Sequence, residues 1–493
     1  MPAHRLNLWR TLLALLLAVA AFAPVRAQGE RPAPPGPVEA VTTPPHACKL
    51  PGLKEEVRCA TYAVWEDREG KKGRKIGLNV VILPAKGPDK LPDPLFFFGG
   101  GPGEGITGAA EGLIDSPMRQ KRDIVLVDQR GTGRSHTLDC DFWGRPLDLR
   151  KAAVDSFPIE DVRACLARLE KKADLRFYTT PLSMDDVDEV RAWLGYGKIN
   201  LSGGSYGTRA AQVYLQRHPE SVRTVTLTAV APLDEYLPLH HAYAGQRALD
   251  MIFAECAADA ACHAAYPNLK QELAAVLERV DKGVTVTVTN PVTHQRQEVR
   301  PSRGLVAEGM RFLLYGAGGG NLPRQIHQAF EGNLEPLVQM SIERRLGIDD
   351  ALAMGMLFSV TCAEDLPFID DATAARETQG TILGDYRIRQ QKEVCKVWPR
   401  GEIPANLHTP LRSDVPVLLI AGERDPVTPP EFAQRAAKGL TNSLVVLVPR
   451  GSHGGAGECT YKMIQQLIET ASVKGIDTSC LQKLPPTKFT TSG

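Results

Sequence analysis

One stretch of the 493-residue chain decides its fold class: Ile199-Asn200-Leu201-Ser202-Gly203-Gly204-Ser205-Tyr206-Gly207. It begins with an apolar, strand-like run and ends in the pattern G-x-S-x-G, which a helix-like segment follows. In this pattern the serine sits on a tight strand-to-helix turn, where side chains at the neighbouring glycine positions would clash. We therefore predict that Ser205 is a nucleophile. Ser202 is the nearby alternative, but it does not lie between the motif glycines.

Other apolar runs lie on both sides of this stretch, and helix-like segments separate them. The runs cover residues 95–98, 124–127, 225–227, 415–420 and 444–448. In one helix-like segment Met184, Val187 and Val190 recur at helical spacing, and Ser183 with Asp186 resembles a capping box at its start. Buried strands that alternate with amphipathic helices predict an α/β fold with a mostly parallel sheet covered on both faces.

The alternation of strands and helices is interrupted once. It stops near Asp234 and returns at Val415, and the residues between are mostly helical in period. We therefore predict a core made of residues 55–233 and 406–493, with a large, mainly helical cap formed by residues 234–405. Residues 28–54 are expected to form an extended lead-in, because their first part is rich in proline and polar residues.

The N-terminus has the pattern of a secretory signal peptide. Two arginines, Arg5 and Arg10, precede an apolar run from Thr11 to Ala23. Val25 and Ala27 then supply the small residues that a signal peptidase requires at its cleavage site. The run is shorter than the roughly 20 residues that span a bilayer, which disfavours the alternatives of a membrane anchor or a buried helix. We predict cleavage after Ala27 and a secreted or periplasmic protein with no stable membrane anchor.

Composition excludes several classes of protein. Apolar residues make up 43% of the chain, which is enough for a sizeable core and rules out a mainly disordered state. Loss of residues 1–27 removes three arginines and no acidic residue, so 58 basic and 57 acidic residues become 55 and 57, a net charge of −2. This balance provides no electrostatic basis for a nucleic-acid partner.

A serine nucleophile needs a base and an acid, and their expected chain order is Ser, acid, His. His453 lies in a glycine-rich loop just after the last apolar run, and Asp425 lies just after the run before it. We predict His453 as the base and Asp425 as the residue that orients it. Glu423 is the close alternative to Asp425; its competing interpretation is a surface carboxylate paired with Arg424.

The tetrahedral intermediate of acyl transfer needs backbone N–H donors for its oxyanion. One donor is expected to be the N–H of Tyr206, which follows the nucleophile. The other is expected from the glycine-rich loop at residues 99–103, where Gly101 is the first choice and Gly100 is possible.

The same loop carries a competing pattern. Residues 103–108 read G-x-G-x-x-G, and Asp128 follows about 20 residues later, as in a dinucleotide-binding fingerprint. Pro102 interrupts the turn, and this interpretation leaves the serine, acid and histidine without a role. We instead expect Asp128 and Arg130 to form a buried hydrogen-bonded network that supports the oxyanion loop.

The ten cysteines fall into five couples that are close in sequence. No C-x-x-C pair occurs, so the sequence indicates neither a zinc site nor a thioredoxin-like site. Because sequence does not determine connectivity, nearest-neighbour pairing is our hypothesis: 48–59, 140–165, 256–262, 362–395 and 459–480.

Three motifs in order resemble a known family. They are Phe98-Gly99-Gly100-Gly101-Pro102-Gly103, Asp128-Gln129-Arg130-Gly131-Thr132-Gly133-Arg134-Ser135 and Gly203-Gly204-Ser205-Tyr206-Gly207. They look like the α/β-hydrolase peptidases that include proline iminopeptidases and secreted tripeptidyl aminopeptidases. Proline iminopeptidases usually have a histidine where Gly99 stands, so the resemblance favours the secreted branch.

The resemblance also implies a site for the substrate's free α-amino group, because acidic residues of the cap bind it in this family. Glu364 and Asp365 are the candidates, and a solvated acidic turn beside a disulfide is the alternative.

Together these features predict a secreted serine hydrolase with an α/β-hydrolase fold and a helical cap. The expected substrates are short peptides with a free N-terminus, from which proline or a short (tri)peptide is released, and no metal or organic cofactor is implied. The alternatives are an exported carboxylesterase or lactonase with the same triad, and a catalytically silent exported binding protein.

Overall fold

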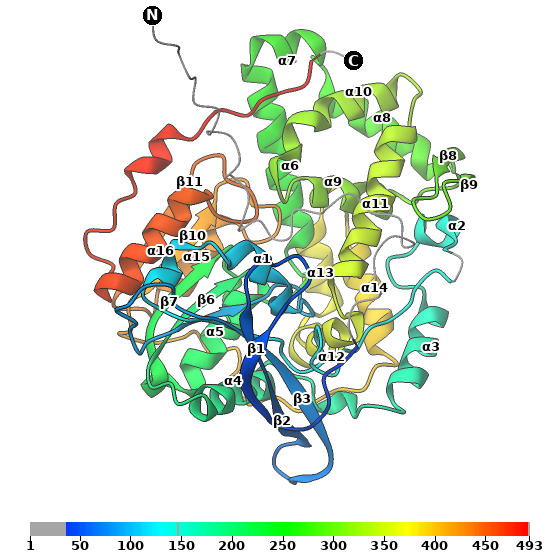
Figure 1. Cartoon of the computed structure of the whole chain (residues 1–493). Helices are drawn as coiled ribbons and strands as arrows, with labels where there is room; N and C mark the ends of the chain where they lie inside the picture. Colours follow the sequence, from blue (N-terminus) through cyan, green and yellow to red (C-terminus); the bar gives the residue numbers. More distant parts are fainter. Residues whose placement is uncertain (1–35, 145–146, 492–493) are drawn as a thin grey trace, which may run out of the picture.

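A computed structural model describes residues 36–144 and 147–491, so the predicted signal peptide at residues 1–27 lies outside the described part. Its centre is a sheet of nine strands in the order β1-β2-β3-β5-β4-β6-β7-β10-β11 (Figure 1). The strand that carries the serine motif, β6, lies between β4 and β7. The strands of this sheet are β1 (Thr43–Cys48), β2 (Val57–Asp67), β3 (Lys72–Leu83), β4 (Leu95–Phe98), β5 (Ile124–Val127), β6 (Ile199–Gly204), β7 (Val222–Thr228), β10 (Val417–Gly422) and β11 (Ser443–Val448).

Strand direction divides the sheet into two parts. β1, β2, β3 and β5 pair antiparallel in turn. From β5 through β4, β6, β7 and β10 to β11, every neighbouring pair is parallel. The carboxyl ends of these parallel strands therefore meet at one edge of the sheet, where ligand and catalytic sites of α/β sheets lie. The prediction of a mostly parallel sheet is confirmed.

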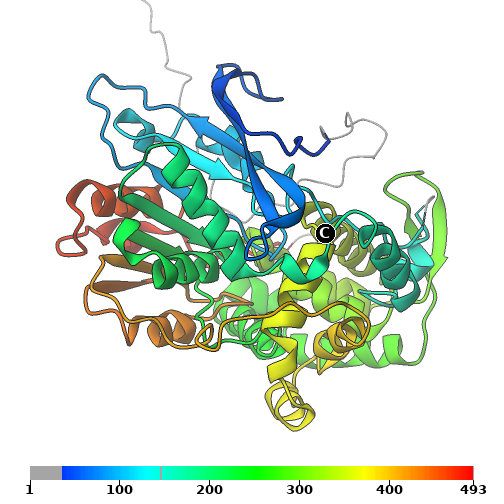
Figure 2. The same cartoon turned by 90° about the horizontal axis from the view of Figure 1, so that it is seen from below.

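The sheet is buried on both faces, which explains why its strands are fully apolar in sequence. In β4, Phe96 and Phe98 pack into the core on the side of α4, α5 and α15, and Leu95 and Phe97 pack into the core on the side of α1 and α16. Figure 2 shows helices on both sides of the strands. The helices outside the inserted region are α1 (Ala110–Leu113), α2 (Leu149–Ala152), α3 (Ile159–Leu169), α4 (Thr180–Trp193), α5 (Tyr206–Arg217), α15 (Pro430–Ala437) and α16 (Glu458–Thr470).

The predicted capping box at Ser183 is wrong. Helix α4 begins at Thr180, one turn earlier, with Pro181 in its first turn, where proline is favoured. Ser183 lies inside the helix, and its hydroxyl donates to the Thr179 carbonyl at 3.0 Å. Asp186 does not cap the helix. Its carboxylate instead accepts hydrogen bonds from Arg130 at 2.7 and 2.8 Å.

An extra helical region lies between β7 and β10, as predicted, on one side of the sheet (Figure 1). A short ribbon of β8 (Val286–Thr289) and β9 (Arg296–Val299) interrupts it, which the helical period did not indicate. Its α-helices are α6 (His241–Ala258), α7 (Ala260–Ala265), α8 (Leu269–Asp281), α9 (Arg303–Leu313), α10 (Leu322–Phe330), α11 (Glu335–Ala351), α12 (Met354–Glu364), α13 (Asp371–Thr378) and α14 (Tyr386–Cys395).

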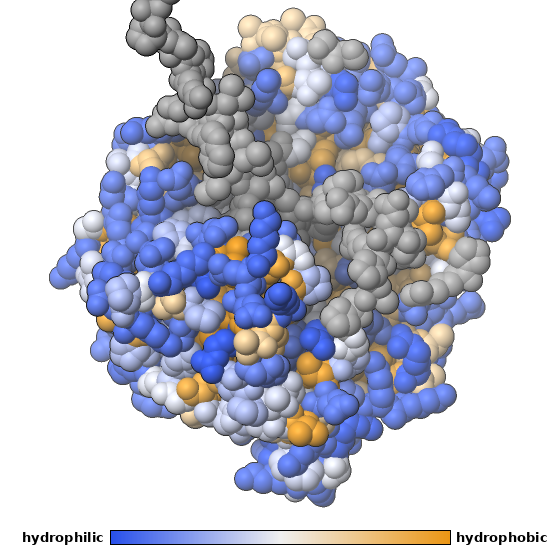
Figure 3. Space-filling model, viewed as in Figure 1, coloured by the Kyte–Doolittle hydropathy of each residue, from blue (hydrophilic) through white to orange (hydrophobic). Residues whose placement is uncertain are grey.

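Short 3-10 turns complete the secondary structure. They are η1 (Ile106–Ala109), η2 (Pro117–Gln120), η3 (Leu175–Phe177), η4 (Pro219–Ser221), η5 (Ala317–Asn321), η6 (Leu366–Phe368) and η7 (Ser479–Lys483). The face of the molecule in Figure 3 is largely hydrophilic, with small apolar patches among charged residues. Among the described residues, every helix is too short or too polar to cross a membrane.

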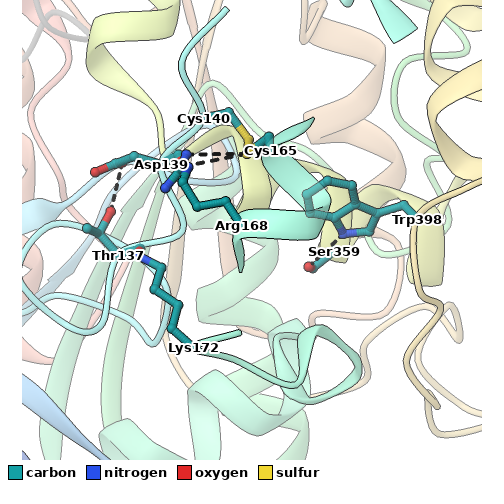
Figure 4. The surroundings of a disulfide bond; sticks show 8 residues. All are labelled: Thr137, Asp139, Cys140, Cys165, Arg168, Lys172, Ser359 and Trp398. Atoms are coloured by element: carbon teal, nitrogen blue, oxygen red, sulfur yellow. Dashed lines mark hydrogen bonds between the residues drawn. A yellow bond between two sulfur atoms is a disulfide. The ribbon is translucent and has the colours of Figure 1, made fainter. Parts of the chain in front are cut away.

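All five predicted disulfides are present: 48–59, 140–165, 256–262, 362–395 and 459–480. The bond between Cys140 and Cys165 ties the segment after β5 to α3 (Figure 4). Beside it Arg168 donates to the Asp139 carbonyl at 2.6 Å, and Lys172 donates to the Thr137 carbonyl at 2.8 Å. These cross-links restrict the unfolded chain and so stabilise the fold.

The two motif glycines allow the turn at Ser205 to form. A Cβ on Gly203 would lie 2.2 Å from the Gly207 carbonyl oxygen, and a Cβ on Gly207 would lie 2.3 Å from the Phe98 carbonyl oxygen. Both obstacles are backbone atoms, which have no rotamer that would relieve the contact. The absence of side chains at Gly203 and Gly207 allows helix α5 to pack directly against β4 and β6.

We expect Gly207→Ala to destabilise the protein by about 2–3 kcal/mol, because the added methyl group overpacks a rigid backbone contact. Gly204→Ala is the matched control, since a Cβ at Gly204 would meet nothing within 4 Å. Thermal unfolding of the two variants checks this. Equal unfolding midpoints for the two variants would contradict the role given to Gly207.

Candidate functional site

Ser205 occupies a strained turn at the carboxyl end of β6. Its backbone has φ 56° and ψ −126°, a region that residues with a side chain rarely adopt. Hydrogen bonds secure the turn: the Ser205 N–H donates to the Thr228 carbonyl at 3.0 Å, and the Thr208 N–H donates to the Ser205 carbonyl at 2.9 Å. Ser202 lies within β6 and is only 4% exposed. The fold thus presents Ser205 rather than Ser202 at the edge of the sheet.

Asp425 and His453 form a buried pair on the loops after β10 and β11. The Nδ1–H of His453 donates to the Asp425 carboxylate, with 2.9 Å to each oxygen. The carboxylate also accepts the N–H groups of Val427 and Thr428 at 2.8 Å and the Thr428 hydroxyl at 2.7 Å. With its lone pairs occupied in this way, Asp425 holds the imidazole in one orientation.

The alternative acid, Glu423, lies apart from this pair. Its carboxylate accepts the Arg450 N–H at 2.7 Å. The suggested pairing of Glu423 with Arg424 is wrong, because Arg424 forms its ion pair with Glu255 at 2.9 Å. The structure therefore brings Asp425, and not Glu423, to the histidine.

The second imidazole nitrogen of His453 is available for chemistry. His453 is 2% exposed, and its Nε2 has no hydrogen-bond partner within residues 36–144 and 147–491. The Tyr315 ring packs edge-on against the imidazole with the ring centres 4.7 Å apart. Ser452, which precedes the histidine, donates its hydroxyl to the Leu314 carbonyl at 2.5 Å. The extra helical region thus helps to hold the histidine loop in place.

The glycine-rich loop after β4 borders Ser205. A Cβ on Gly100 would lie 3.5 Å from the Ser205 Cβ, so the loop backbone and the serine are neighbours. The Gly100 N–H already donates to the Glu104 carboxylate at 2.6 Å. Neither the Gly101 N–H nor the Tyr206 N–H has an acceptor in the part of the chain that the structure describes. Gly101 and Tyr206 are therefore better placed than Gly100 as oxyanion donors.

The predicted joint network of Asp128 and Arg130 is wrong, because the two side chains bind different partners; Asp128 instead binds the segment that follows the glycine-rich loop. Its carboxylate accepts the N–H groups of Thr107 and Arg134 at 2.9 and 3.0 Å. Arg130 instead forms its ion pair with Asp186. The dinucleotide pattern has a packing explanation, because a Cβ on Gly105 would lie 2.6 Å from the Gly133 Cα.

Glu104 is a site residue that we did not anticipate. Burial raises the pKa of its carboxyl group, and the opposing hydrogen bond from the Gly100 N–H does not cancel this effect. No basic side chain among the described residues forms an ion pair with it. In the sequence, Glu104 is a single acidic residue inside a glycine-rich loop. The dinucleotide-like pattern at residues 103–108 includes this position but gives it no role.

Glu364 and Asp365 lie at the end of α12, and both are fully buried. Glu364 accepts the N–H and the hydroxyl of Thr180 at 2.6 and 2.8 Å, and that hydroxyl also contacts the Tyr206 hydroxyl at 2.6 Å. Asp365 forms an ion pair with Arg209 at 2.8 Å. The alternative of a solvated acidic turn is wrong. Binding of an amino group by these two carboxylates stays a prediction, and each already has partners.

The geometry agrees with comparisons to known proteins. A family model described as the alpha/beta hydrolase fold matches residues 93–255, which include the oxyanion loop and Ser205. This chain has the α/β-hydrolase fold. A second model, described as TAP-like protein, matches residues 380–480, which include Asp425 and His453. The predicted fold class, with its additional helical region, is confirmed.

Several relatives of this chain are named as hydrolases or peptidases. YuaR of Escherichia coli (strain K12), named as a hydrolase, is 22% identical over 391 residues, 76% of each chain. The proline iminopeptidase of Neisseria gonorrhoeae is 30% identical over 143 residues, 29% of this chain and 34% of that protein. The serine protease Hip1 of Mycobacterium tuberculosis is 29% identical over 280 residues, 53% of each chain. The match thus spans about a third of the proline iminopeptidase and about half of Hip1. The predicted resemblance to such peptidases is confirmed.

Glu364 should make stability depend on pH. Burial raises its pKa from 4.5 to about 7, although Arg209 opposes the shift. A carboxyl group with a higher pKa in the folded state stabilises the fold at low pH, and that contribution is lost as pH rises from 4.5 through about 7. Glu364→Gln mimics the neutral form, so we expect it to gain on the order of 3 kcal/mol relative to wild type across this range.

Denaturant unfolding from pH 4 to 8 measures this gain. Glu170→Gln, at the exposed position just after α3, serves as the control, and its stability should run parallel to that of wild type. Parallel curves for Glu364→Gln and wild type would show that the buried carboxyl does not titrate in this window.

Proposed function

We propose that this α/β-hydrolase is an exported serine aminopeptidase that releases proline or a short (tri)peptide from the free N-terminus of peptides through an acyl-enzyme. The observation that carries the proposal is the buried Asp425–His453 pair, whose free Nε2 lies on the same sheet edge that presents Ser205 on a strained turn. The peptidase-named relatives support the choice of peptides as substrates.

In the proposed acylation step His453 acts first as a base and then as an acid. Ser205 Oγ attacks the scissile carbonyl carbon while His453 Nε2 takes the hydroxyl proton, and Asp425 stabilises the resulting imidazolium. The N–H groups of Gly101 and Tyr206 bind the oxyanion of the tetrahedral intermediate. Collapse of the intermediate breaks the C–N bond, and His453 returns the proton to the leaving amine. Water then repeats these steps on the acyl-enzyme and frees Ser205.

Glu104 supports the requirement for a free amino group. An ionised carboxylate beside Ser205 would repel the oxyanion that forms there, because like charges interact strongly away from water. The ammonium group of a peptide N-terminus would neutralise this charge, whereas a blocked N-terminus would not. Glu104 thereby joins Glu364 and Asp365 as a candidate for recognition of the amino group, and its lack of a basic partner among the described side chains favours it.

The extra helical region supports a preference for short peptides. The Ala353 N–H, at the junction of α11 and α12, donates to the Gly103 carbonyl at 3.0 Å. A Cβ on Gly101 would lie 3.1 Å from the Leu352 side chain. This junction therefore covers the oxyanion loop and leaves little room for a folded protein substrate. The five disulfides support export, because such bonds persist in oxidising compartments.

Ser205→Ala should lower the hydrolysis of proline and tripeptidyl p-nitroanilides by at least about 10⁴-fold while leaving the fold intact, and Asp425→Asn should lower it by about 10⁴-fold. Ser202→Ala is the matched control and should stay within about twofold of wild type. Full turnover by Ser205→Ala would end this mechanism. Hydrolysis of p-nitrophenyl esters without anilide cleavage would point to an esterase, and failure of a fluorophosphonate probe to label Ser205 would point to a binding protein.

Glu104→Gln should lower kcat/KM for anilides with a free amino group by roughly tenfold or more, since a charged hydrogen bond contributes about 1.5–3 kcal/mol. The N-acetylated versions of the same anilides should not lose activity. The exposed Glu111→Gln, in the neighbouring helix α1, is the control and should match wild type. An equal effect of Glu104→Gln on free and acetylated substrates would exclude contact with the amino group and return the role to Glu364 or Asp365.

A further inference from the structure

Arg424 connects the two loops that carry Asp425 and His453. It directly precedes the acid in the chain, and its Nε and Nη2 donate to the Arg450 carbonyl in the histidine loop at 3.1 and 2.7 Å. Its backbone N–H donates to the Gly451 carbonyl at 2.7 Å. Arg424 therefore fixes the acid loop against the histidine loop through both its backbone and its side chain.

The geometry of the candidate catalytic site depends on the relative position of these loops. The hydrogen bond from His453 Nδ1 to the Asp425 carboxylate, at 2.9 Å, joins one loop to the other. The Nε2 atom has no partner within the described residues, so it does not anchor the imidazole at its other end. A shift of one loop would therefore move Nε2 relative to Ser205. A displacement of about 1 Å at reacting groups can lower a rate by about 100-fold.

The remaining end of the Arg424 guanidinium is held by two residues from distant parts of the chain. Its Nη1 lies 2.9 Å from the carboxylate of Glu255 on α6 and donates to the Thr487 hydroxyl at 2.9 Å. That hydroxyl in turn donates to the Glu255 carboxylate at 2.5 Å. The side chains of Arg424 and Glu255 are 14% and 23% exposed, so water competes only in part for these charge-assisted contacts. Arg424, Glu255 and Thr487 thus form a closed triangle.

Thr487 belongs to a C-terminal strap, residues 484–490, which crosses from the core to the inserted helical region. Figure 1 shows this red segment running from the side of α16 toward α7. At its start the Leu484 carbonyl accepts the Arg450 Nη2 at 2.9 Å. At its end the Thr490 carbonyl accepts the hydroxyl of Tyr266, just after α7, at 3.0 Å. The strap therefore spans the edge of the molecule that carries the histidine loop.

Both ends of the strap dock on braced parts of the fold. The Cys459–Cys480 bond ties α16 to the chain just before the strap, and the Cys256–Cys262 bond ties α6 to α7 at its far end. The strap also fits closely, because a Cβ on Gly320 would lie 2.2 Å from a carbonyl oxygen of the strap. Cross-links at both ends keep the docking surfaces in fixed positions.

We propose that Arg424 is a positioning residue for the Asp425–His453 pair and that the strap secures it through Thr487. Docking of the strap thereby holds the acid and histidine loops in the arrangement that aims the imidazole at Ser205. The proposal rests on the proposed roles of Ser205 and His453, but the position of the loops is measurable without turnover.

The rate at which a fluorophosphonate probe labels Ser205 in the full chain tests the catalytic consequence, because labelling needs an aligned histidine. At saturating probe Arg424→Gln should label about 10- to 100-fold more slowly. Arg424→Lys should recover part of the rate, because an ammonium keeps the charge but lacks the planar fork. The probe concentration that gives half the maximal rate should change by less than about twofold, which separates misalignment from loss of the binding surface.

Thr487 offers a matched pair of variants that spares the ion pair between Arg424 and Glu255. Thr487→Val removes the hydroxyl at nearly constant shape and should lower the labelling rate by roughly threefold to tenfold, as expected for one hydrogen bond. Thr487→Ser keeps the hydroxyl and should stay within about twofold of wild type. Lys488→Gln, at an exposed position of the strap, is a second control that should match wild type. Thermal unfolding confirms that each variant is folded.

Hydrogen–deuterium exchange read by mass spectrometry follows the loops directly. Peptides that cover residues 422–427 and 449–455 should exchange faster in Thr487→Val than in Thr487→Ser, because a released strap leaves the loops less protected. Equal exchange and equal labelling rates for this pair would overturn the proposal. Failure of the proposed function is distinguishable, because Ser205 would then resist the probe in wild type while the exchange difference between the two Thr487 variants still decides the role of the strap.

Discussion

The site depends on the close approach of α5 to β4 and β6, which forces the backbone at Ser205 into its strained turn. At Gly203 and Gly207 the helix and strands touch through backbone atoms alone, so a side chain at either position would push them apart. The strain at φ 56° is held by hydrogen bonds from neighbouring segments, including the Thr228 carbonyl of β7. The surrounding sheet stabilises a conformation that an isolated turn would not keep.

The other parts of the site are positioned by the same sheet and by the region inserted into it. Parallel strands bring the loops after β4, β6, β10 and β11 to one edge, although these loops are far apart in the chain. The inserted helices then contact this edge at two places: Ala353 binds the oxyanion loop, and Leu314 accepts the Ser452 hydroxyl beside the histidine. The inserted helical region thus helps to order the candidate site.

Much of the site was predictable because its residues belong to short motifs with fixed structural contexts. Ser205 sits between motif glycines after a strand, and Asp425 and His453 each follow an apolar run, so chain order and strand position were enough to select them. The disulfides were also found from spacing, since their partners are neighbours in sequence. The start of α4 was missed because Ser183 mimics a cap, while the helix begins one turn earlier, at Thr180, with Pro181 in its first turn.

Sequence alone determined the fold class and selected Ser205, Asp425 and His453 as candidates, because these inferences depend on short motifs and on their order along the chain. Tertiary structure alone decided which donors and charges remain free. Gly101 is favoured over Gly100 because Glu104 folds back onto the Gly100 N–H, and Arg311 of α9 and Arg387 of α14 both pair with one carboxylate, Glu308. Such facts concern burial and competition for partners between distant segments, and no local pattern encodes them.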